Sequence, residues 1–130
     1  MNMKDDAAVK AVGAYGGGIA SSGNVCGTLL GGIAMISSIY SRADLEEKED
    51  PRIWALSKKF MKEFEKLTES FGGINCCDIA RVDWQDRDAV KAYYKNPDSN
   101  RKACIQLVGD ASYVLGALLD QEADEKKEKP

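Results

Sequence analysis

The sequence contains no histidine. This absence excludes a Ser-His-Asp triad, a Cys-His dyad, a histidine metal site and a haem bound by an internal histidine. General acid–base chemistry in this chain therefore depends on carboxylates, lysines, tyrosines or thiols. Four cysteines are present, at positions 26, 76, 77 and 104, and most of the functional information in the sequence lies with them.

An excess of positive charge is also missing. Lysine and arginine number 18 against 21 aspartates and glutamates, for a net charge of −3. This balance provides no basic surface for nucleic acid or for an anionic membrane. Asp5 and Asp6 stand where a signal peptide has cationic and apolar residues, and the most apolar stretch, Val25–Tyr40, is shorter than the roughly 20 residues of a transmembrane helix. We therefore expect a cytoplasmic protein with no nucleic-acid partner and no membrane insertion.

The length and composition predict a single globular domain. The chain has 130 residues, of which 44% are hydrophobic and 30% are charged. This is enough for one core, but the chain is too short for two ordinary domains. We assign residues 1–121 to one helical domain. Residues 122–130 are almost all charged, and we expect them to form a solvated end that frays.

Glycines and acidic residues separate the stretches that have helical periodicity. A glycine-rich loop over 16–23 precedes an apolar helix over 25–41, for which Asn24 is a suitable N-cap. An amphipathic helix begins at Asp50-Pro51 and has apolar residues three and four apart up to Phe71. Shorter helices are expected over 76–84 and 86–94, before a final helix from residue 98 or 99. The prediction is an all-α compact bundle of four to five helices, with a glycine-rich loop before the central apolar helix.

The cysteines lie near three of the expected helix starts. Cys26 lies in the first turn of the central helix, Cys76 and Cys77 follow Asn75, and Cys104 lies early in the final helix on its apolar face. Free N–H groups and the helix dipole favour a thiolate at a helix start. Three interpretations remain open at this point: the cysteines fill the core as small apolar residues, they share a redox or metal site, or they are surface thiols placed by coincidence.

The glycines and the aromatic residues have structural explanations as well as functional ones. Residues 16–23 do not form a phosphate-binding loop, because Asn24 stands where that motif needs lysine. Gly27 and Gly31 are four apart on the central helix, and they permit a cofactor, a packed helix or a second chain to approach the backbone closely. Trp84 and Tyr93-Tyr94 are expected to be packing or interface aromatics.

Several of these motifs together resemble the C_GCAxxG_C_C family of redox-active proteins, which is related to a domain of split-Soret cytochromes. Cys26-Gly27-Thr28-Leu29-Leu30-Gly31 resembles the CGAxxG signature, and Tyr15-Gly16-Gly17-Gly18-Ile19 precedes it. A phenylalanine-rich helix follows, and then the segments Gly72-Gly73-Ile74-Asn75-Cys76 and Cys104-Ile105-Gln106-Leu107-Val108. The similarity extends from about Ala11 to Leu119.

Two positions depart from the family pattern. Thr28 replaces an alanine and adds a hydroxyl beside Cys26. Family members also carry a cysteine upstream of the glycine-rich loop, which this sequence lacks, so either the chain begins late or Cys77 supplies the fourth thiol. The resemblance implies that Cys26, Cys76 and Cys104 are the family cysteines and that Cys77 is additional.

The resemblance implies a redox function, which includes the possibility of an oxidoreductase. In the first form of this hypothesis, Cys26, Cys76, Cys77 and Cys104 bind an iron–sulfur cluster for electron transfer, with zinc as the second choice of metal. In the second form, Cys26, Cys76 and Cys104 are redox thiols of a cofactor-free thiol–disulfide oxidoreductase. A non-catalytic helical interaction module with buried cysteines is the third reading. Either redox form implies a redox partner protein.

Two expectations concern the folded chain. Cys26, Cys76 and Cys104 should converge, although they lie far apart in sequence. The chain should also form a homodimer, because its apolar central helix and its glycine faces leave a short chain with apolar surface to cover.

Overall fold

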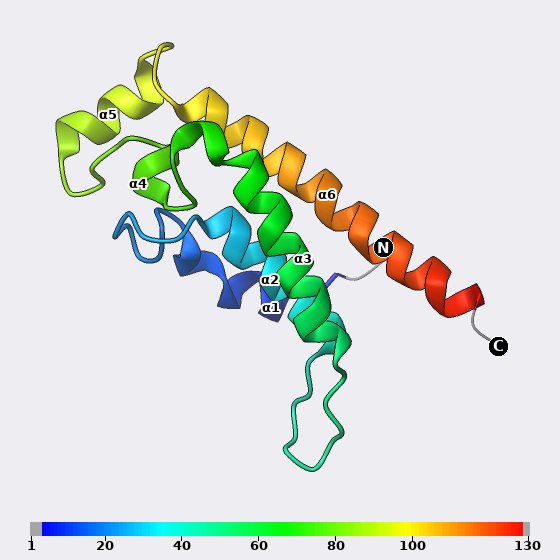
Figure 1. Ribbon diagram of the computed structural model, residues 1–130. Coiled ribbons are helices and arrows are strands. Elements are labelled where there is room, and N and C mark those ends of the chain that lie inside the picture. Colours follow the sequence, from blue (N-terminus) through cyan, green and yellow to red (C-terminus); the bar gives the residue numbers. More distant parts are fainter. Residues whose placement is uncertain (1–3, 129–130) are drawn as a thin grey trace.

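Three helices form the body of the molecule: α2 (Gly27–Tyr40), α3 (Arg52–Leu67) and α6 (Arg101–Glu128). The computed structural model describes residues 4–128. Each of the three helices contacts the other two, and α6 is the longest element (Figure 1). The core of the protein lies where the three helices meet.

The core is built around two phenylalanines of α3. Phe60 and Phe64 are fully buried, and their rings lie 6.3 Å apart. Their spacing, together with buried Leu56, is the four-residue repeat that predicts an amphipathic helix. Buried residues of the other two helices complete this cluster, namely Leu29 and Ile36 of α2 and Leu107, Ala111 and Leu119 of α6.

Short helices occupy the rest of the described chain: α1 (Asp6–Ala11), α4 (Cys76–Ile79), α5 (Arg87–Lys95) and the 3₁₀ turns η1 (Gly13–Tyr15) and η2 (Glu69–Phe71). The all-α prediction is confirmed, with six α-helices and no strand among residues 4–128, against the four to five helices expected. The helix expected over 76–84 ends at Ile79, because Arg81 adopts a left-handed φ of 52° that no α-helix accommodates.

The glycine-rich loop is ordered by an unusual run of left-handed residues. Gly17 and Gly18 have positive φ angles, and so do the next three residues, Ile19, Ala20 and Ser21, at 69°, 52° and 60°. The backbone of this segment is nevertheless well bonded: Gly23 and Asn24 donate N–H bonds to the carbonyls of Gly17 and Gly18, at 2.9 and 3.0 Å. These bonds offset the steric cost of the left-handed conformation.

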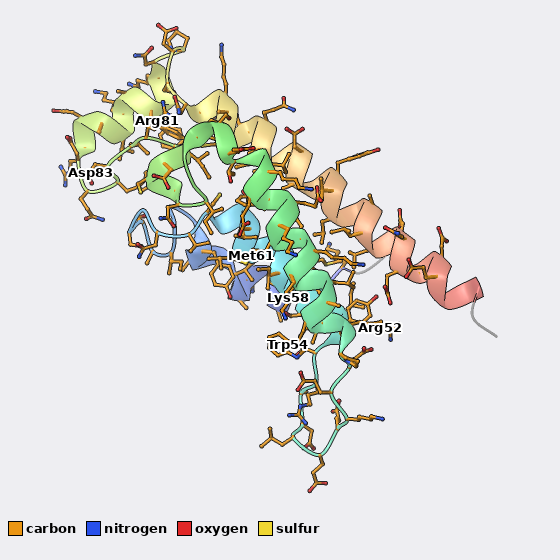
Figure 2. The ribbon with its side chains drawn as sticks, viewed as in Figure 1. Arg52, Trp54, Lys58, Met61, Arg81 and Asp83 are labelled. Atoms are coloured by element: carbon orange, nitrogen blue, oxygen red, sulfur yellow. The ribbon has the colours of Figure 1, made fainter. Side chains whose placement is uncertain are left out.

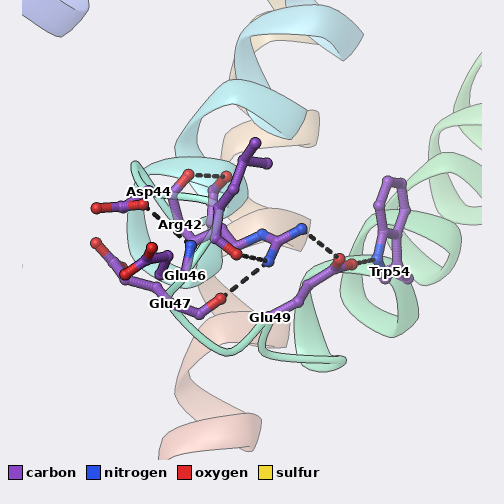
Figure 3. Close-up of polar contacts among 8 residues, drawn as sticks. Arg42, Asp44, Glu46, Glu47, Glu49 and Trp54 are labelled. Atoms are coloured by element: carbon purple, nitrogen blue, oxygen red, sulfur yellow. Dashed lines mark hydrogen bonds and ion pairs between the residues drawn. The ribbon is translucent and has the colours of Figure 1, made fainter.

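Arg42 organises the loop that joins α2 to α3. Its Nη1 donates hydrogen bonds to the carbonyls of Leu45 and Glu47, both at 2.9 Å (Figure 3). Its Nη2 lies 3.9 Å from Glu49, whose carboxylate also accepts a hydrogen bond from the Trp54 indole. Trp54, Lys58 and Met61 then follow one side of α3 at helical spacing (Figure 2).

Arg52 links the ends of three helices. Its guanidinium pairs with Asp50 at 2.6 Å, lies 3.9 Å from Glu122 of α6 and stacks 4.8 Å from the ring centre of Tyr40 in α2. The helix α6 therefore continues past residue 121, and the segment that we expected to fray is helical as far as Glu128. Glutamate and lysine are good helix formers, which explains this continuation. Residues 129–130 of that segment lie outside the described residues.

Gly32 of α2 is the position where α3 comes closest. A Cβ at Gly32 would overlap the Phe60 ring, whereas a Cβ at Gly31 would meet nothing within 4 Å. The close approach that we predicted at Gly31 is therefore made by Gly32 instead, because Gly31 points to the side of α2 that α3 does not cover. The glycine at position 32 sets how closely Phe60 enters the core.

We predict that Gly32→Ala destabilises the protein and that Gly31→Ala does not. The added methyl at position 32 displaces Phe60, and overpacking of this kind costs about 1–3 kcal/mol. The same change at position 31 enters open space and improves helix propensity by up to about 1 kcal/mol. Urea unfolding followed by circular dichroism measures both free energies, and equal losses in the two variants would contradict the assignment.

Candidate functional site

Two segments far apart in sequence are paired through their backbones at the centre of the candidate site. Val25 and Asn75 form an isolated antiparallel bridge. On one side of it, the Cys26 N–H donates to the Ile74 carbonyl at 3.0 Å, and on the other the Cys76 N–H donates to the Asn24 carbonyl at 2.6 Å. This pairing holds the start of α2 beside the start of α4.

Three of the four cysteines line one pocket. Cys26, Cys76 and Cys104 contribute to a cavity of about 400 Å³. The structure thus brings together the three cysteines that the sequence predicts to converge, one each from the starts of α2, α4 and α6. Its other walls come from the glycine-rich segment 15–18 and from Trp84 and Tyr93.

The glycine-rich loop forms a wall of this pocket because it has no side chains there. A Cβ at Gly18 would lie 2.6 Å from the Cβ of Cys76 and 2.6 Å from the backbone oxygen of Asn24. A Cβ at Gly27 would lie 2.7 Å from the Tyr15 carbonyl. The group that approaches Gly27 closely is therefore the loop backbone, which differs from the cofactor, packed helix or second chain that we had expected there.

Trp84 and Tyr93 place hydrogen-bond donors on two of the sulfurs. The indole Nε1–H of Trp84 donates to Cys76 Sγ at 3.3 Å, and the Tyr93 hydroxyl is hydrogen-bonded to the Cys104 thiol. The two rings contact each other edge to face, 5.1 Å apart. From the sequence we interpreted these aromatics as packing residues and did not predict that they are hydrogen-bond donors. The donor role depends on the tertiary fold, which places the segment 80–86 against Cys76.

Burial and these donors act in opposite directions on the thiols. Burial raises the pKa of Cys76, and the hydrogen bond from Trp84 opposes that rise. Burial likewise raises the pKa of Cys104, and the hydrogen bond with Tyr93 opposes it. The pKa of Tyr93 itself is raised, first by burial and then by its bond to Cys104. The aromatic pair therefore tunes how readily the two thiols lose a proton.

Cys77 lies apart from the other three cysteines. Its side chain is exposed and lines a separate hollow of about 400 Å³. Arg81 and Asp83, in the segment between α4 and α5, line the same hollow (Figure 2). The structure therefore does not place Cys77 in the pocket as the fourth thiol that the sequence suggested.

Cys26 lies at a helix start as predicted, whereas the helix-start argument is wrong for Cys76 and Cys77. Cys26 is the N-cap of the 14-residue α2, the role we had expected for Asn24. By contrast, α4 has only 4 residues, and its first amides are already bonded. The Cys76 N–H donates to the Asn24 carbonyl and the Cys77 N–H to the Gly23 carbonyl, at 2.6 and 3.1 Å. Those amides are therefore not free to stabilise a thiolate.

The pocket offers the donor atoms of a metal site without the spacing of one. Three thiols line the cavity, and thiolates are the ligands that zinc and iron–sulfur clusters prefer. However, residues 4–128 contain no group of three or more cysteine, aspartate or glutamate side chains close enough together to hold a metal ion. The chemistry of the donors thus suits a metal, but their spacing in this structure does not.

Comparison with known proteins identifies one family. The model of the family described as "Putative redox-active protein (C_GCAxxG_C_C)" matches residues 1–118. No curated protein and no solved structure gives a significant match.

We predict that Trp84→Phe raises the pKa of Cys76 and that Tyr93→Phe raises the pKa of Cys104. Each change removes a donor to sulfur, and a hydrogen bond to a charged group contributes about 1.5–3 kcal/mol, equivalent to about one to two pKa units. Alkylation rates measured against pH, with each cysteine followed by peptide mass spectrometry, should move to higher pH by that amount. Trp54→Phe and Tyr113→Phe, which alter exposed aromatics, are the matched controls. Equal shifts in variants and controls would contradict the donor assignment.

Proposed function

We propose, on the premise that this chain belongs to the C_GCAxxG_C_C family of redox-active proteins, that its pocket of three cysteines performs reversible thiol–disulfide exchange. The observation that carries the proposal is the convergence of Cys26, Cys76 and Cys104 on one cavity from three separate segments. Cysteines that merely fill a core need no common cavity and no hydrogen-bond donors on their sulfurs.

Cys26 is the proposed attacking thiol. It is half-buried at the N-terminus of α2 and lines the cavity. Cys76 and Cys104 are the proposed partner thiols, and burial raises the pKa of both. A thiol that is accessible is suited to first contact with an external disulfide, and a buried thiol is suited to completing the reaction.

Cys76 is the proposed resolving thiol. The backbone pairing across Val25 and Asn75 fixes its segment against that of Cys26. The Cys26 thiolate attacks one sulfur of a partner's disulfide, which forms a mixed disulfide and releases one partner thiolate. The Cys76 thiolate then attacks the Cys26 sulfur, which forms the Cys26–Cys76 disulfide and releases the second partner thiolate. Two protons leave the pocket thiols, and two electrons pass to the partner protein.

A cytoplasmic location is part of the same proposal. All four cysteines are free in the structure. A reversible dithiol is useful where thiols are kept reduced, which supports a cytoplasmic location.

A metal–thiolate centre is the second candidate, and one observation favours it. Three thiols line the pocket, one more than a disulfide requires. An iron–sulfur cluster or a zinc ion would use Cys26, Cys76 and Cys104 as ligands, and these sulfurs would first have to move closer together. Such a centre would serve electron transfer or a structural role.

We predict that mild oxidation removes two hydrogens from the protein and links Cys26 to Cys76. Peptide mass spectrometry after treatment with an excess of a small disulfide identifies the pair. Cys26→Ser and Cys76→Ser should each abolish the intramolecular disulfide. Cys77→Ser should retain it, because Cys77 lies in a different hollow.

Anaerobic purification separates the two candidates. Iron and zinc analysis together with a visible absorption spectrum should show neither metal in stoichiometric amount if the pocket works as a dithiol. One equivalent of a cluster or of zinc that is lost in Cys26→Ser and kept in Cys77→Ser would overturn the dithiol proposal in favour of the metal centre. A disulfide between Cys26 and Cys104 would retain the redox function and refute the role of Cys76.

A further inference from the structure

One side of the α2–α6 pair is apolar and uncovered. A groove of about 240 Å³ lies between the two helices, and buried Phe60 of α3 contributes to its lining. Gly31 of α2 and Val108 and Ser112 of α6 form its edges. None of the described residues that line the groove is charged.

Beside the groove, one side of α6 carries two large apolar residues followed by two glycines. Ile105 and Val108 are 57% and 49% exposed. At Gly109 and Gly116, a Cβ would meet nothing within 4 Å. Spacings of three, four and seven residues put all four on one side of the helix. This side therefore has an apolar ridge, formed by Ile105 and Val108, next to two hollows at Gly109 and Gly116. The ridge of a second chain can enter these hollows.

The surface area of the chain exceeds that of a compact monomer. Its accessible surface is 9074 Å², whereas a monomer of 14.2 kDa exposes about 6,800 Å². The excess is roughly 2,300 Å², part of which belongs to the loop over 41–50 and the end of α6. A stable dimer needs only about 800 Å² from each partner. The excess is therefore larger than the area that each partner of a stable dimer buries.

We propose that this face binds a second copy of the same chain in a two-fold symmetric dimer. In such an interface the same patch meets itself, so the ridge at Ile105 and Val108 of one copy faces the hollows at Gly109 and Gly116 of the other. Because the face holds both the ridge and the hollows, it is complementary to itself. The absence of charge among the described lining residues removes the repulsion that a two-fold axis would otherwise create between like charges.

A lipid bilayer fits this face less well than a second copy does. Over Arg101–Glu125, α6 is long and apolar enough to cross a membrane, and only 17% of its most apolar window is buried. However, Leu107, Ala111 and Leu119 of the same helix are buried against α2 and α3, so insertion would empty the core. Asp110, which accepts a hydrogen bond from Gln106 at 2.9 Å, lies in the middle of the stretch.

The proposed interface adjoins the cysteine pocket. Thr28 lines both the groove and the cavity that holds Cys26. Dimerisation would therefore cover one flank of the pocket without occupying it, and the redox chemistry does not depend on it. Failure of the dimer and failure of thiol exchange are separately observable.

Sedimentation equilibrium of the full chain tests the proposal. At micromolar concentration, the wild-type protein should have twice the mass of the 14.2 kDa chain. Gly109→Glu, which fills a hollow, and Ile105→Glu, which breaks the ridge, should each weaken the dimer by at least about 100-fold, because like charges then face each other across the axis. Ala117→Glu adds the same charge on another side of α6 and should leave the dimer intact.

Circular dichroism confirms that the variants are folded, and Gly109→Glu is well suited because its side chain enters open space and improves helix propensity. A wild-type monomer at 100-fold higher concentration would overturn the proposal. A dimer that Gly109→Glu and Ile105→Glu leave unchanged would overturn it as well. A monomer that floats with phosphatidylcholine vesicles, and loses that binding in Ile105→Glu, would assign the face to lipid instead.

Discussion

The candidate site depends on one backbone pairing, between the segments 23–26 and 74–77. Three backbone hydrogen bonds cross it, donated by the amides of Cys26, Cys76 and Cys77, and the first two make up the bridge between Val25 and Asn75. Without this pairing, the glycine-rich loop and the turn after α3 would have no fixed relation, and neither would their cysteines. The pairing uses backbone groups, so side-chain substitutions tolerated elsewhere leave it intact unless they fill the space that Gly18 keeps open.

The left-handed run from Gly17 to Ser21 is the second constraint on the site. Each non-glycine residue in this conformation costs roughly 1–2 kcal/mol, and three such residues follow one another here. The left-handed conformation turns the loop sharply enough for Gly18 to contact Cys76, and this contact is what the conformational free energy makes possible. Backbone strain of this kind persists only when the surrounding structure fixes it, and here the amides of Gly23 and Asn24 supply the bonds.

Local patterns predicted more of the helices than of the site. The spacing of Leu56, Phe60 and Phe64 identified the buried face of α3, because amphipathic periodicity is a property of the helix alone. The sequence did not predict that Gly32, and not Gly31, makes the close contact with α3, since this depends on which side of α2 faces α3. Sequence motifs brought Cys26, Cys76 and Cys104 into one hypothesis. The place of Cys77 outside the pocket depends on how α4 is oriented, and the donor on the Cys76 sulfur depends on the path of the chain after Ile79.

Trp84 lies where its fluorescence can report on the oxidation state of the cysteine pocket. Its indole lines the cysteine pocket and also the hollow that contains Cys77, and its N–H points at the Cys76 sulfur. The chain has two tryptophans, and the other, Trp54, lies at the opposite end of α3 from the site. We expect the fluorescence of Trp84 to change when Cys76 is oxidised, because the indole N–H donates to the Cys76 sulfur. The chemistry of the pocket is therefore open to stopped-flow spectroscopy without any attached label.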